Sequence, residues 1–387
     1  MFIKALKHQN PALISATHRL WQQGNIAPDS WVIDVDQVLD NGRRLLAVAE
    51  QYGITLYLMT KQFGRNPWLA EKLLALGYQG IVAVDYKESR VIRRAGLHVA
   101  HQGHLVQIPS SLVETAVAHN TDIITVFSLE KVREISAAAA RLGRIQAVML
   151  KVYAEGDTLY PGQESGFPLE ELDEVVTQLR LLPGIRLAGL THFPCLLWND
   201  TLAQNLPTQN LQTLVTARHR LAQRGIEIAQ LNAPSAASCT SLPLLADFDV
   251  THTEPGHALT GTIPANQHGD QPERIAMLLL TEVSHSFKGQ SYCYGGSYYR
   301  RGHARNALIF TPGSDLPTEA LLSKMDDSSI DYHLVLQGEY PPGSAVILCF
   351  RTQIFVTRSD VVLVTGIQHG EAAIVARYDS LGNIQEE

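Results

Sequence analysis

The stretch ITLYLMTK, residues 54–61, is an apolar run that ends on a lysine. Its β-branched and aromatic residues are typical of a buried strand, and helix signals resume at Pro67. The run belongs to a series in which short apolar segments alternate with longer helical patterns, which predicts repeated βα units around a parallel sheet. Eight strands are expected: 31–35, 54–60, 80–85, 98–102, 122–127, 146–152, 185–193 and 226–233.

The helical stretches between these strands carry their own end signals. Residues 36–53 begin with an acidic residue and end on Gly53, and residues 168–184 begin with Pro168 and end at a Pro-Gly pair. Eight such units over about 230 residues predict a (β/α)8 TIM barrel, whose functional residues lie at the carboxyl ends of the strands. A doubly wound open sheet is the alternative.

The remainder of the chain has a different pattern. After residue 265, strand-like segments are separated by proline, glycine and aspartate, as in a β domain. We therefore expect a barrel over residues 31–265 and a C-terminal β domain over residues 266–387. Residues 1–30 form an N-terminal segment that is expected to pack on the β domain.

Composition excludes several classes of protein. A chain of 387 residues with 45% hydrophobic residues can bury a large core, unlike a disordered or small disulfide-stabilised chain. A formal net charge of -7 gives no general attraction to nucleic acid or membranes, so a small-molecule partner is expected. We find no membrane helix or signal peptide pattern and expect a cytoplasmic protein. The four cysteines are too widely spaced for a zinc site or a disulfide framework.

Two residues at predicted strand ends could carry chemistry. Lys61 follows an apolar strand, and partial desolvation there favours the neutral amine that forms a Schiff base. His192 ends the strand at 185–193 and would lie at the same rim of the barrel. A solvent-facing lysine and a core histidine held by one hydrogen bond are the alternatives.

Two segments at the same rim suit an anion. NAPSAASCTSL, residues 232–242, brings hydroxyls at Ser235 and Ser238 and opens a helix, while EPGHALTG, residues 254–261, offers glycine amides. Hydroxyls, amides and a helix N-terminus bind phosphate, and the loops after strands seven and eight are the usual phosphate site of this barrel. A phosphate-bearing ligand is therefore expected.

The order of these segments resembles the pyridoxal-phosphate enzymes of the alanine racemase and ornithine decarboxylase fold, known as fold type III. The resemblance covers residues 31–262 and extends more loosely to YCYGGSY at residues 292–298. The matching segments are Asp34-Val35-Asp36, MTKQFG (59–64), TVFSLEKVREI (125–135), GLTHF (189–193), NAPSA (232–236) and EPGHALTG (254–261).

The resemblance implies roles for individual residues. Lys61 would hold the aldehyde of pyridoxal 5′-phosphate as a Schiff base and act as acid or base on one face of the substrate Cα. His192 would stack on the pyridine ring. Ser235 and the amides of Gly256 and His257 would hold the phosphate.

Glu254 departs from the racemase pattern. The resemblance places arginine beside the pyridine nitrogen in racemases, whereas the decarboxylases have Glu-Pro-Gly-Arg and this chain has Glu-Pro-Gly-His. A carboxylate keeps the nitrogen protonated and makes the ring a stronger electron sink. A solvated loop carboxylate is the alternative reading of Glu254.

A racemase needs a second acid/base group on the face opposite Lys61. The resemblance places Tyr294 there, with Cys293 and Tyr298 as alternatives, and ordinary β packing of this tyrosine cluster also stays open. It further implies a homodimer in which the β domain of one subunit completes the site of the other.

These expectations favour an amino-acid racemase or epimerase, an isomerase, that uses Lys61 and Tyr294. The first alternative is a pyridoxal-phosphate-dependent decarboxylase or related lyase, which Glu254 favours and the absence of the decarboxylases' Cys-Asp-Gly run weakens. A non-catalytic pyridoxal-phosphate-binding protein is the second, although the large β domain argues against it. A barrel enzyme that uses a metal or a phosphate substrate is the third.

Overall fold

The computed structural model describes residues 1–326 and 328–386, which form two compact units. One comprises residues 1–43, 61–69 and 257–387 and is called here the β unit. The other comprises residues 44–60 and 70–256 and is called the barrel unit.

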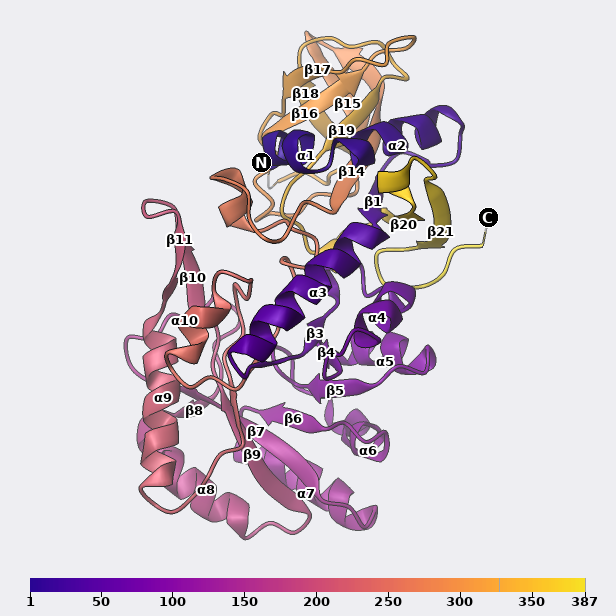
Figure 1. Ribbon diagram of the computed structural model, residues 1–387. Helices are drawn as coiled ribbons and strands as arrows, with labels where there is room; N and C mark the ends of the chain where they lie inside the picture. The colour runs from indigo at the N-terminus through magenta and orange to yellow at the C-terminus, as the bar shows by residue number, and fades with distance from the viewer. Residues whose placement is uncertain (327, 387) are drawn as a thin grey trace. The chain divides into compact units, whose positions relative to one another are not determined.

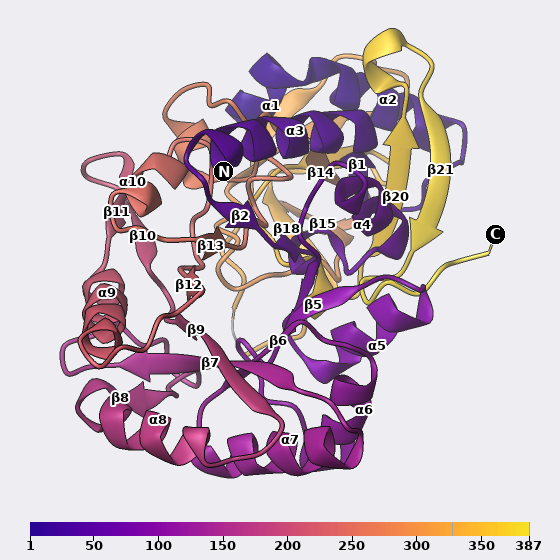
Figure 2. The same cartoon turned by 60° about the horizontal axis from the view of Figure 1, so that its bottom comes forward.

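Parallel strands form a ring in the barrel unit (Figure 2). β2 and β3 stand at the two ends of the strand order, yet they are consecutive pieces of one segment, residues 55–59, so the ring returns to its starting point. The expected parallel barrel is therefore confirmed. In ring order the strands are β2 (Thr55–Leu56), β13 (His252–Thr253), β12 (Gln230–Asn232), β9 (Ile185–Thr191), β7 (Gln146–Tyr153), β6 (Ile123–Val126), β5 (Val99–Gln102), β4 (Ile81–Ala83) and β3 (Leu58–Met59).

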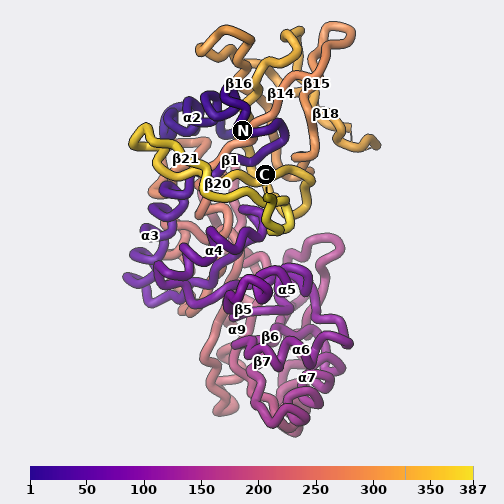
Figure 3. Tube along the Cα trace, turned by 90° about the vertical axis from the view of Figure 1, so that its right-hand side faces the viewer, coloured from indigo at the N-terminus to yellow at the C-terminus, as the bar shows by residue number. Residues whose placement is uncertain are grey.

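Helices cover the outside of this ring, and α5, α6 and α7 can be followed beside β5, β6 and β7 (Figure 3). Side-chain caps define where some of them begin: Asp85 accepts from the amide of Glu88 at 2.8 Å, and Ser128 accepts from the amide of Lys131 at 3.3 Å. The helices are α3 (Val35–Gln51), α4 (Pro67–Leu74), α5 (Tyr86–Arg94), α6 (Val113–Ala118), α7 (Leu129–Arg141), α8 (Leu172–Arg180), α9 (Gln209–Ala222) and α10 (Leu242–Ala246). Outside the ring, β8 (Phe167–Pro168) pairs with β7, and β10 (Leu196–Asn199) pairs with β11 (Gln204–Pro207).

The expectation that residues 31–35 form the first barrel strand is wrong. This segment is β1 (Ser30–Asp34), which lies between antiparallel β14 (Met277–Phe287) and parallel β20 (Asp360–Thr365) in the sheet of the β unit. A fully buried strand has the same apolar pattern in either sheet, because the pattern reports burial and not the pairing partner. The last barrel strand is β13, which is too short to produce a recognisable apolar run.

The β unit contains the second sheet, in the order β17, β16, β19, β14, β1, β20, β21, with β15 and β18 attached through β14. Helices α1 (Ile3–Gln9) and α2 (Pro11–Gln22) lie against this sheet (Figure 1), and Leu6 and Leu13 share a core with Leu278 and Ile347. The other strands are β15 (Gln290–Tyr294), β16 (Asn306–Phe310), β17 (Thr318–Leu321), β18 (His333–Gln337), β19 (Ala345–Leu348) and β21 (Ala373–Tyr378).

Short 3-10 helices complete the secondary structure: η1 (Lys61–Phe63), η2 (Ser110–Leu112), η3 (Leu169–Glu171), η4 (Pro264–Gln267), η5 (Ile354–Val356) and η6 (Ile367–His369). Among the residues that the structure describes, no helix combines the length and the apolar character needed to cross a membrane.

Candidate functional site

Lys61 begins η1 immediately after the barrel strand β3 and is buried. The amide of Met59 donates to the carbonyl oxygen of Pro255 at 3.3 Å, so the end of β3 runs beside the segment that follows β13. Lys61 comes two residues after Met59, and His257 comes two residues after Pro255. The predicted lysine and the predicted anion-binding segment therefore start from neighbouring strand ends.

His257 has a neutral imidazole. Burial, followed by the charges of Arg351 and Lys61, holds its pKa well below the ordinary value. Arg351 Nε donates to His257 Nε2 at 3.0 Å, so the ring proton resides on Nδ1, which lies 3.3 Å from Thr262 Oγ1. Both ring nitrogens of His257 thus have partners within the β unit. The group of His257 that was expected to bind phosphate is its backbone amide.

A buried carboxylate that the sequence did not single out holds the residue before Lys61. Glu88 is fully buried, its Oε1 is hydrogen-bonded to Thr60 Oγ1, and its Oε2 accepts from the amide of Val84 at 2.7 Å. Asp85 and Glu88 have the spacing of a helix capping box, a pattern that would suggest a purely local role. The structure shows instead that Glu88 anchors the end of β3.

Glu254 is at the carboxyl end of β13, and its side chain is 1% exposed. Its Oε1 accepts hydrogen bonds from His101 Nδ1 at 2.9 Å and from Asn232 Nδ2 at 2.8 Å. His104 Nε2 lies 3.6 Å from Oε2. Burial alone would raise the pKa of Glu254, but His104, His101 and Asn232 outweigh it and lower that pKa to about 2. Glu254 is therefore a buried carboxylate and not a solvated loop residue.

One oxygen of this carboxylate is left for a ligand. Among the described residues, Oε2 of Glu254 is buried and accepts no hydrogen bond. A buried acceptor without a donor is costly, so the site suits a ligand that supplies an N–H group or a cation. The ligand atoms of His101, His104 and Glu254 lie within 4.8 Å of one another, a spacing that a divalent metal could also use.

His192 is fully buried at the end of β9, and its ring is fixed by two contacts. Its Nδ1 accepts from the amide of Phe193 at 2.8 Å, so Nε2 carries the proton and donates to Asp157 Oδ2 at 2.7 Å. Burial lowers the pKa of His192 more than Asp157 raises it. The ring is consequently neutral and rigidly oriented, and Asp157 is a positioning carboxylate that the sequence did not reveal.

Ser235 is in the loop after β12, with a backbone φ of +105°. Its hydroxyl donates to the carbonyl oxygen of Leu196 at 2.6 Å and accepts from the amide of the same residue at 3.0 Å. The hydroxyl therefore ties the loop to β10. A phosphate oxygen, which only accepts, would have to replace Leu196 as the acceptor of this proton.

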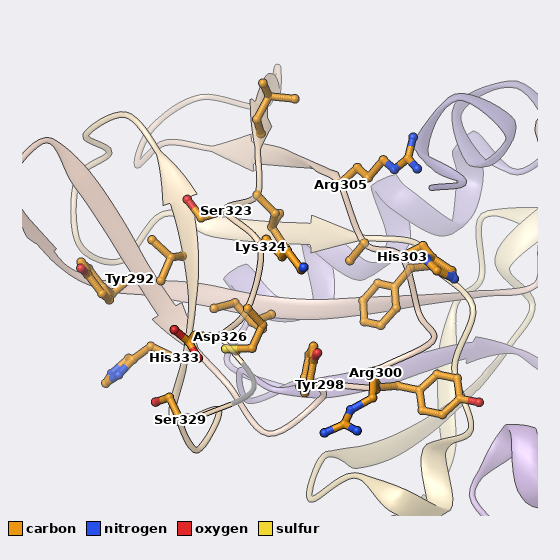
Figure 4. Close-up of a pocket in the computed structure, with 18 of the residues that line it drawn as sticks. Tyr292, Tyr298, Arg300, His303, Arg305, Ser323, Lys324, Asp326, Ser329 and His333 are labelled. Carbon is orange, nitrogen blue, oxygen red and sulfur yellow. The ribbon is translucent and has the colours of Figure 1, made fainter. Parts of the chain in front are cut away.

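The tyrosine segment ends β15 in the β unit. Cys293 is fully buried, and burial raises the pKa of its thiol to about 12. Tyr294, on the opposite face of the strand, is 42% exposed. Tyr298 lines a cavity of about 700 Å³ together with basic side chains that include Arg300 and Lys324 (Figure 4). Of the three candidates, Cys293 is the least able to exchange a proton with a ligand.

Two aspartates hold the turn that follows Tyr294. The amide of Tyr298 donates to Asp331 Oδ2 at 2.9 Å, and Arg358 pairs with Asp331 Oδ1 at 2.8 Å while its amide donates to the carbonyl oxygen of Gly296 at 2.9 Å. Asp29 lies directly behind Gly296, where a Cβ atom would approach Asp29 Oδ2 to 2.0 Å. A side chain at residue 296 would displace Asp29 and would be strained at the φ of +131°, so glycine is strongly favoured there.

Asp29 should make the stability of the protein depend on pH. Burial raises the pKa of Asp29 to about 7, with Ser359 and Arg358 opposing the shift and Asp331 reinforcing it. Because the folded state resists ionisation of this carboxyl, stability should fall as pH rises from about 4 to about 7. Asp29→Asn keeps an acceptor for the hydroxyl of Ser359, and asparagine tolerates the φ of +62°. The substitution should therefore remove the loss of stability between about pH 4 and about pH 7.

We expect Asp29→Asn to exceed the wild type in free energy of unfolding at pH 8 by on the order of 1 kcal/mol, since partial exposure screens the charge. The advantage should vanish near pH 4. Urea unfolding at the two pH values measures this difference. Asp315→Asn, on an exposed turn, changes the net charge equally and serves as the control. An equal gain in free energy of unfolding at both pH values would contradict a raised pKa of Asp29.

Comparison with known proteins defines the class. The alanine racemase N-terminal domain family matches residues 33–264, and the chain belongs to this pyridoxal-phosphate-dependent family. A second family, the YhfX-like C-terminal domain, matches residues 278–374. The chain is 71% identical over 383 residues, 99% of each sequence, to the "Uncharacterized protein YhfX" of Escherichia coli strain K12.

Solved structures share the fold. D-threonine aldolase from Filomicrobium marinum superposes with a TM-score of 0.69 at 14% identity, covering 92% of this chain and 95% of that chain. Alanine racemase from Clostridium difficile 630, in complex with cycloserine, gives a TM-score of 0.66 at 16% identity, covering 92% and 99%. These likenesses confirm the barrel followed by a β domain, and the family confirms pyridoxal 5′-phosphate as the cofactor.

The residues of the barrel unit fit this cofactor. The ring nitrogen of pyridoxal phosphate carries an N–H when protonated, and Oε2 of Glu254 is a buried, ionised acceptor without a hydrogen bond among the described residues. The fit is less complete at the phosphate end, where the hydroxyl of Ser235 already has an acceptor.

Proposed function

We propose that this protein is an amino-acid racemase or epimerase that acts at the substrate Cα. The observation that carries chemistry at Cα is the buried Glu254 carboxylate, whose Oε2 suits the protonated ring nitrogen of pyridoxal phosphate. The exposed Tyr294 is the feature that favours racemisation over a lyase reaction. When bound, the cofactor supplies an electron sink for negative charge at Cα. An ionised carboxylate at the nitrogen keeps that sink at full strength.

The other site residues take roles that match their geometry. Lys61, at the end of β3, would hold the cofactor covalently and move the Cα proton on one face. The neutral His192, fixed by Asp157, would contact the pyridine ring. Ser235, Gly256 and His257 would hold the phosphate.

Tyr294 would move the proton on the opposite face of Cα. Its exposed position on β15 leaves the phenol available to a site, whereas Cys293 on the covered face is excluded by burial. An exposed tyrosine in the β unit also agrees with a homodimer in which this unit completes the partner's site. We further propose that the enzyme works in the cytoplasm and that its substrate is a free amino acid.

A decarboxylase or another lyase is the second candidate function. Glu254 favours it, because the stronger electron sink serves any reaction that leaves negative charge at Cα. Loss of carbon dioxide or cleavage of a side chain needs no proton transfer from the face opposite Lys61. Tyr294 therefore separates the two functions.

Proton exchange at Cα tests the proposal. The protein loaded with pyridoxal phosphate is incubated with single L-amino acids in deuterium oxide. The products are separated by chiral chromatography, and their deuterium content is measured by mass spectrometry. A racemase should produce the D-isomer carrying deuterium at Cα. Exchange with complete retention of configuration would refute the racemase, and release of carbon dioxide from labelled substrate would replace it with the second candidate.

A further inference from the structure

We propose that His101, assisted by His104, is a positioning residue that keeps Glu254 ionised and aimed at the ring nitrogen of the cofactor. The inference rests on the proposed function, because it assigns both histidines to the same site. They act on the cofactor through Glu254 and take no part in moving the substrate proton.

Hydrogen bonding determines the orientation of His101. An ionised carboxylate can only accept, so His101 Nδ1, 2.9 Å from Glu254 Oε1, must carry a proton. The other ring nitrogen, Nε2, is 2.6 Å from Thr125 Oγ1. Asn232 supplies the second donor to Oε1. Because Oε1 is saturated in this way, Oε2 is the oxygen that remains for a ligand.

The turn after β5 brings the second histidine to the same carboxylate. Gly103 has a φ of +86°, and a Cβ atom there would come within 2.5 Å of the carbonyl oxygen of Thr125. Gln107 Nε2 donates to the carbonyl oxygens of both Gly103 and Thr125, at 3.0 and 2.9 Å. The reversal of the chain at Gly103 allows His101 and His104, three residues apart, to face one carboxylate.

Charge explains why two histidines are needed. Other titratable groups that interact with Glu254 include Tyr57 between β2 and β3, Cys195 before β10 and His252 on β13. Burial raises the pKa values of Tyr57 and Cys195, while burial and the charge of His101 lower that of His252 to about 4. These three groups are uncharged near neutral pH and do not compensate the carboxylate, whereas His104 and His101 both lower the pKa of Glu254.

Amide substitutions can test the contacts of the two ring nitrogens of His101 separately. His101→Asn places an amide donor where Nδ1 stood and keeps the hydrogen bond to Glu254. His101→Gln places an amide near Nε2, keeps the contact with Thr125 and loses the one to Glu254. His119→Asn, at an exposed position after α6, is the matched control. Thr125→Val provides a milder change of the same network should His101→Gln fail to fold.

The measurement compares binding of pyridoxal phosphate with binding of a carbocyclic analogue in which C–H replaces the ring nitrogen. Both bear the aldehyde and the phosphate, so the ratio of their dissociation constants isolates recognition of the N–H. The wild type should favour pyridoxal phosphate by about 10- to 100-fold, as expected for a hydrogen bond to a charged group. His101→Gln should lose most of this preference, Thr125→Val part of it, and His101→Asn little.

A second readout follows the protonation of the nitrogen directly. With ¹⁵N-labelled cofactor, the ring nitrogen of the wild type should stay protonated to high pH, and His101→Gln should lose the proton at lower pH. A preference that survives in His101→Gln would overturn the inference while leaving the proposed function intact. Zn²⁺ that binds the cofactor-free protein stoichiometrically and is retained when pyridoxal phosphate is added would also overturn it. Absence of any covalent cofactor in the wild type would instead refute the proposed function.

Discussion

Replacing Lys61 with alanine is expected to abolish covalent attachment of pyridoxal phosphate and to lower turnover by about a thousandfold or more, ~4 kcal/mol in transition-state stabilisation. Lys61 is the lysine that directly follows β3, and Met59 on that strand donates to the carbonyl oxygen of Pro255. Its loss removes both the bond to the cofactor and the group that moves the proton on one face. The absorbance of the bound cofactor and borohydride trapping followed by peptide mass analysis measure the effect.

Lys72→Ala provides the control for Lys61. Lys72 is an exposed lysine on α4 that pairs with Glu71, so its removal should leave cofactor attachment and turnover unchanged. Cofactor trapped on a different lysine of Lys61→Ala, with turnover near that of the wild type, would show that Lys61 has been assigned incorrectly.

Tyr294→Phe is expected to separate racemisation from proton exchange. Removing the phenol deletes the acid/base group on one face, so conversion of L- to D-amino acid should fall by about 10²- to 10⁴-fold. For the enantiomer whose Cα–H faces Lys61, exchange of the Cα proton should continue with retention of configuration. Chiral chromatography and mass spectrometry of the products in deuterium oxide measure both rates in one experiment.

Tyr292→Phe is the matched control on the same strand. Tyr292 stacks on His285 with ring centroids 4.8 Å apart, and its ring packing survives the loss of the hydroxyl. Racemisation at the wild-type rate in Tyr294→Phe would exclude Tyr294, and Tyr298 at the nearby cavity would become the candidate for the second group. An unchanged rate of carbon dioxide release in the same variant would support the lyase.

The barrel could be predicted because its information is local. Apolar runs that alternate with amphipathic stretches report which segments are buried and in which secondary structure. The same runs do not report pairing, which is why residues 31–35 were expected in the barrel although β1 pairs with β14 and β20. β13 was not predicted, because its two residues are too few to give a periodic pattern.

The site was predictable to the extent that its residues follow strands. Lys61 and His192 could be named because each stands at the end of an apolar run and matches a family motif, whereas Glu254 could be named from the family motif alone. His101 and Asp157 were missed because an isolated polar residue near a strand end carries no signal of its partner. The hydrogen bond between His101 and Glu254 joins residues 153 positions apart.

Periodicity and motif order are local properties of a chain, so the parallel barrel, the C-terminal β domain, the cofactor family and the lysine after β3 could all be predicted from the amino-acid sequence. Three features become visible only in the folded chain: β1 belongs to the β unit, Glu254 is buried against two histidines with one oxygen left over, and Asp29 closes the space behind Gly296. Those features depend on which distant segments become neighbours. The burial and the charges that neighbours impose set the protonation of each group, and they exist only once the chain has folded.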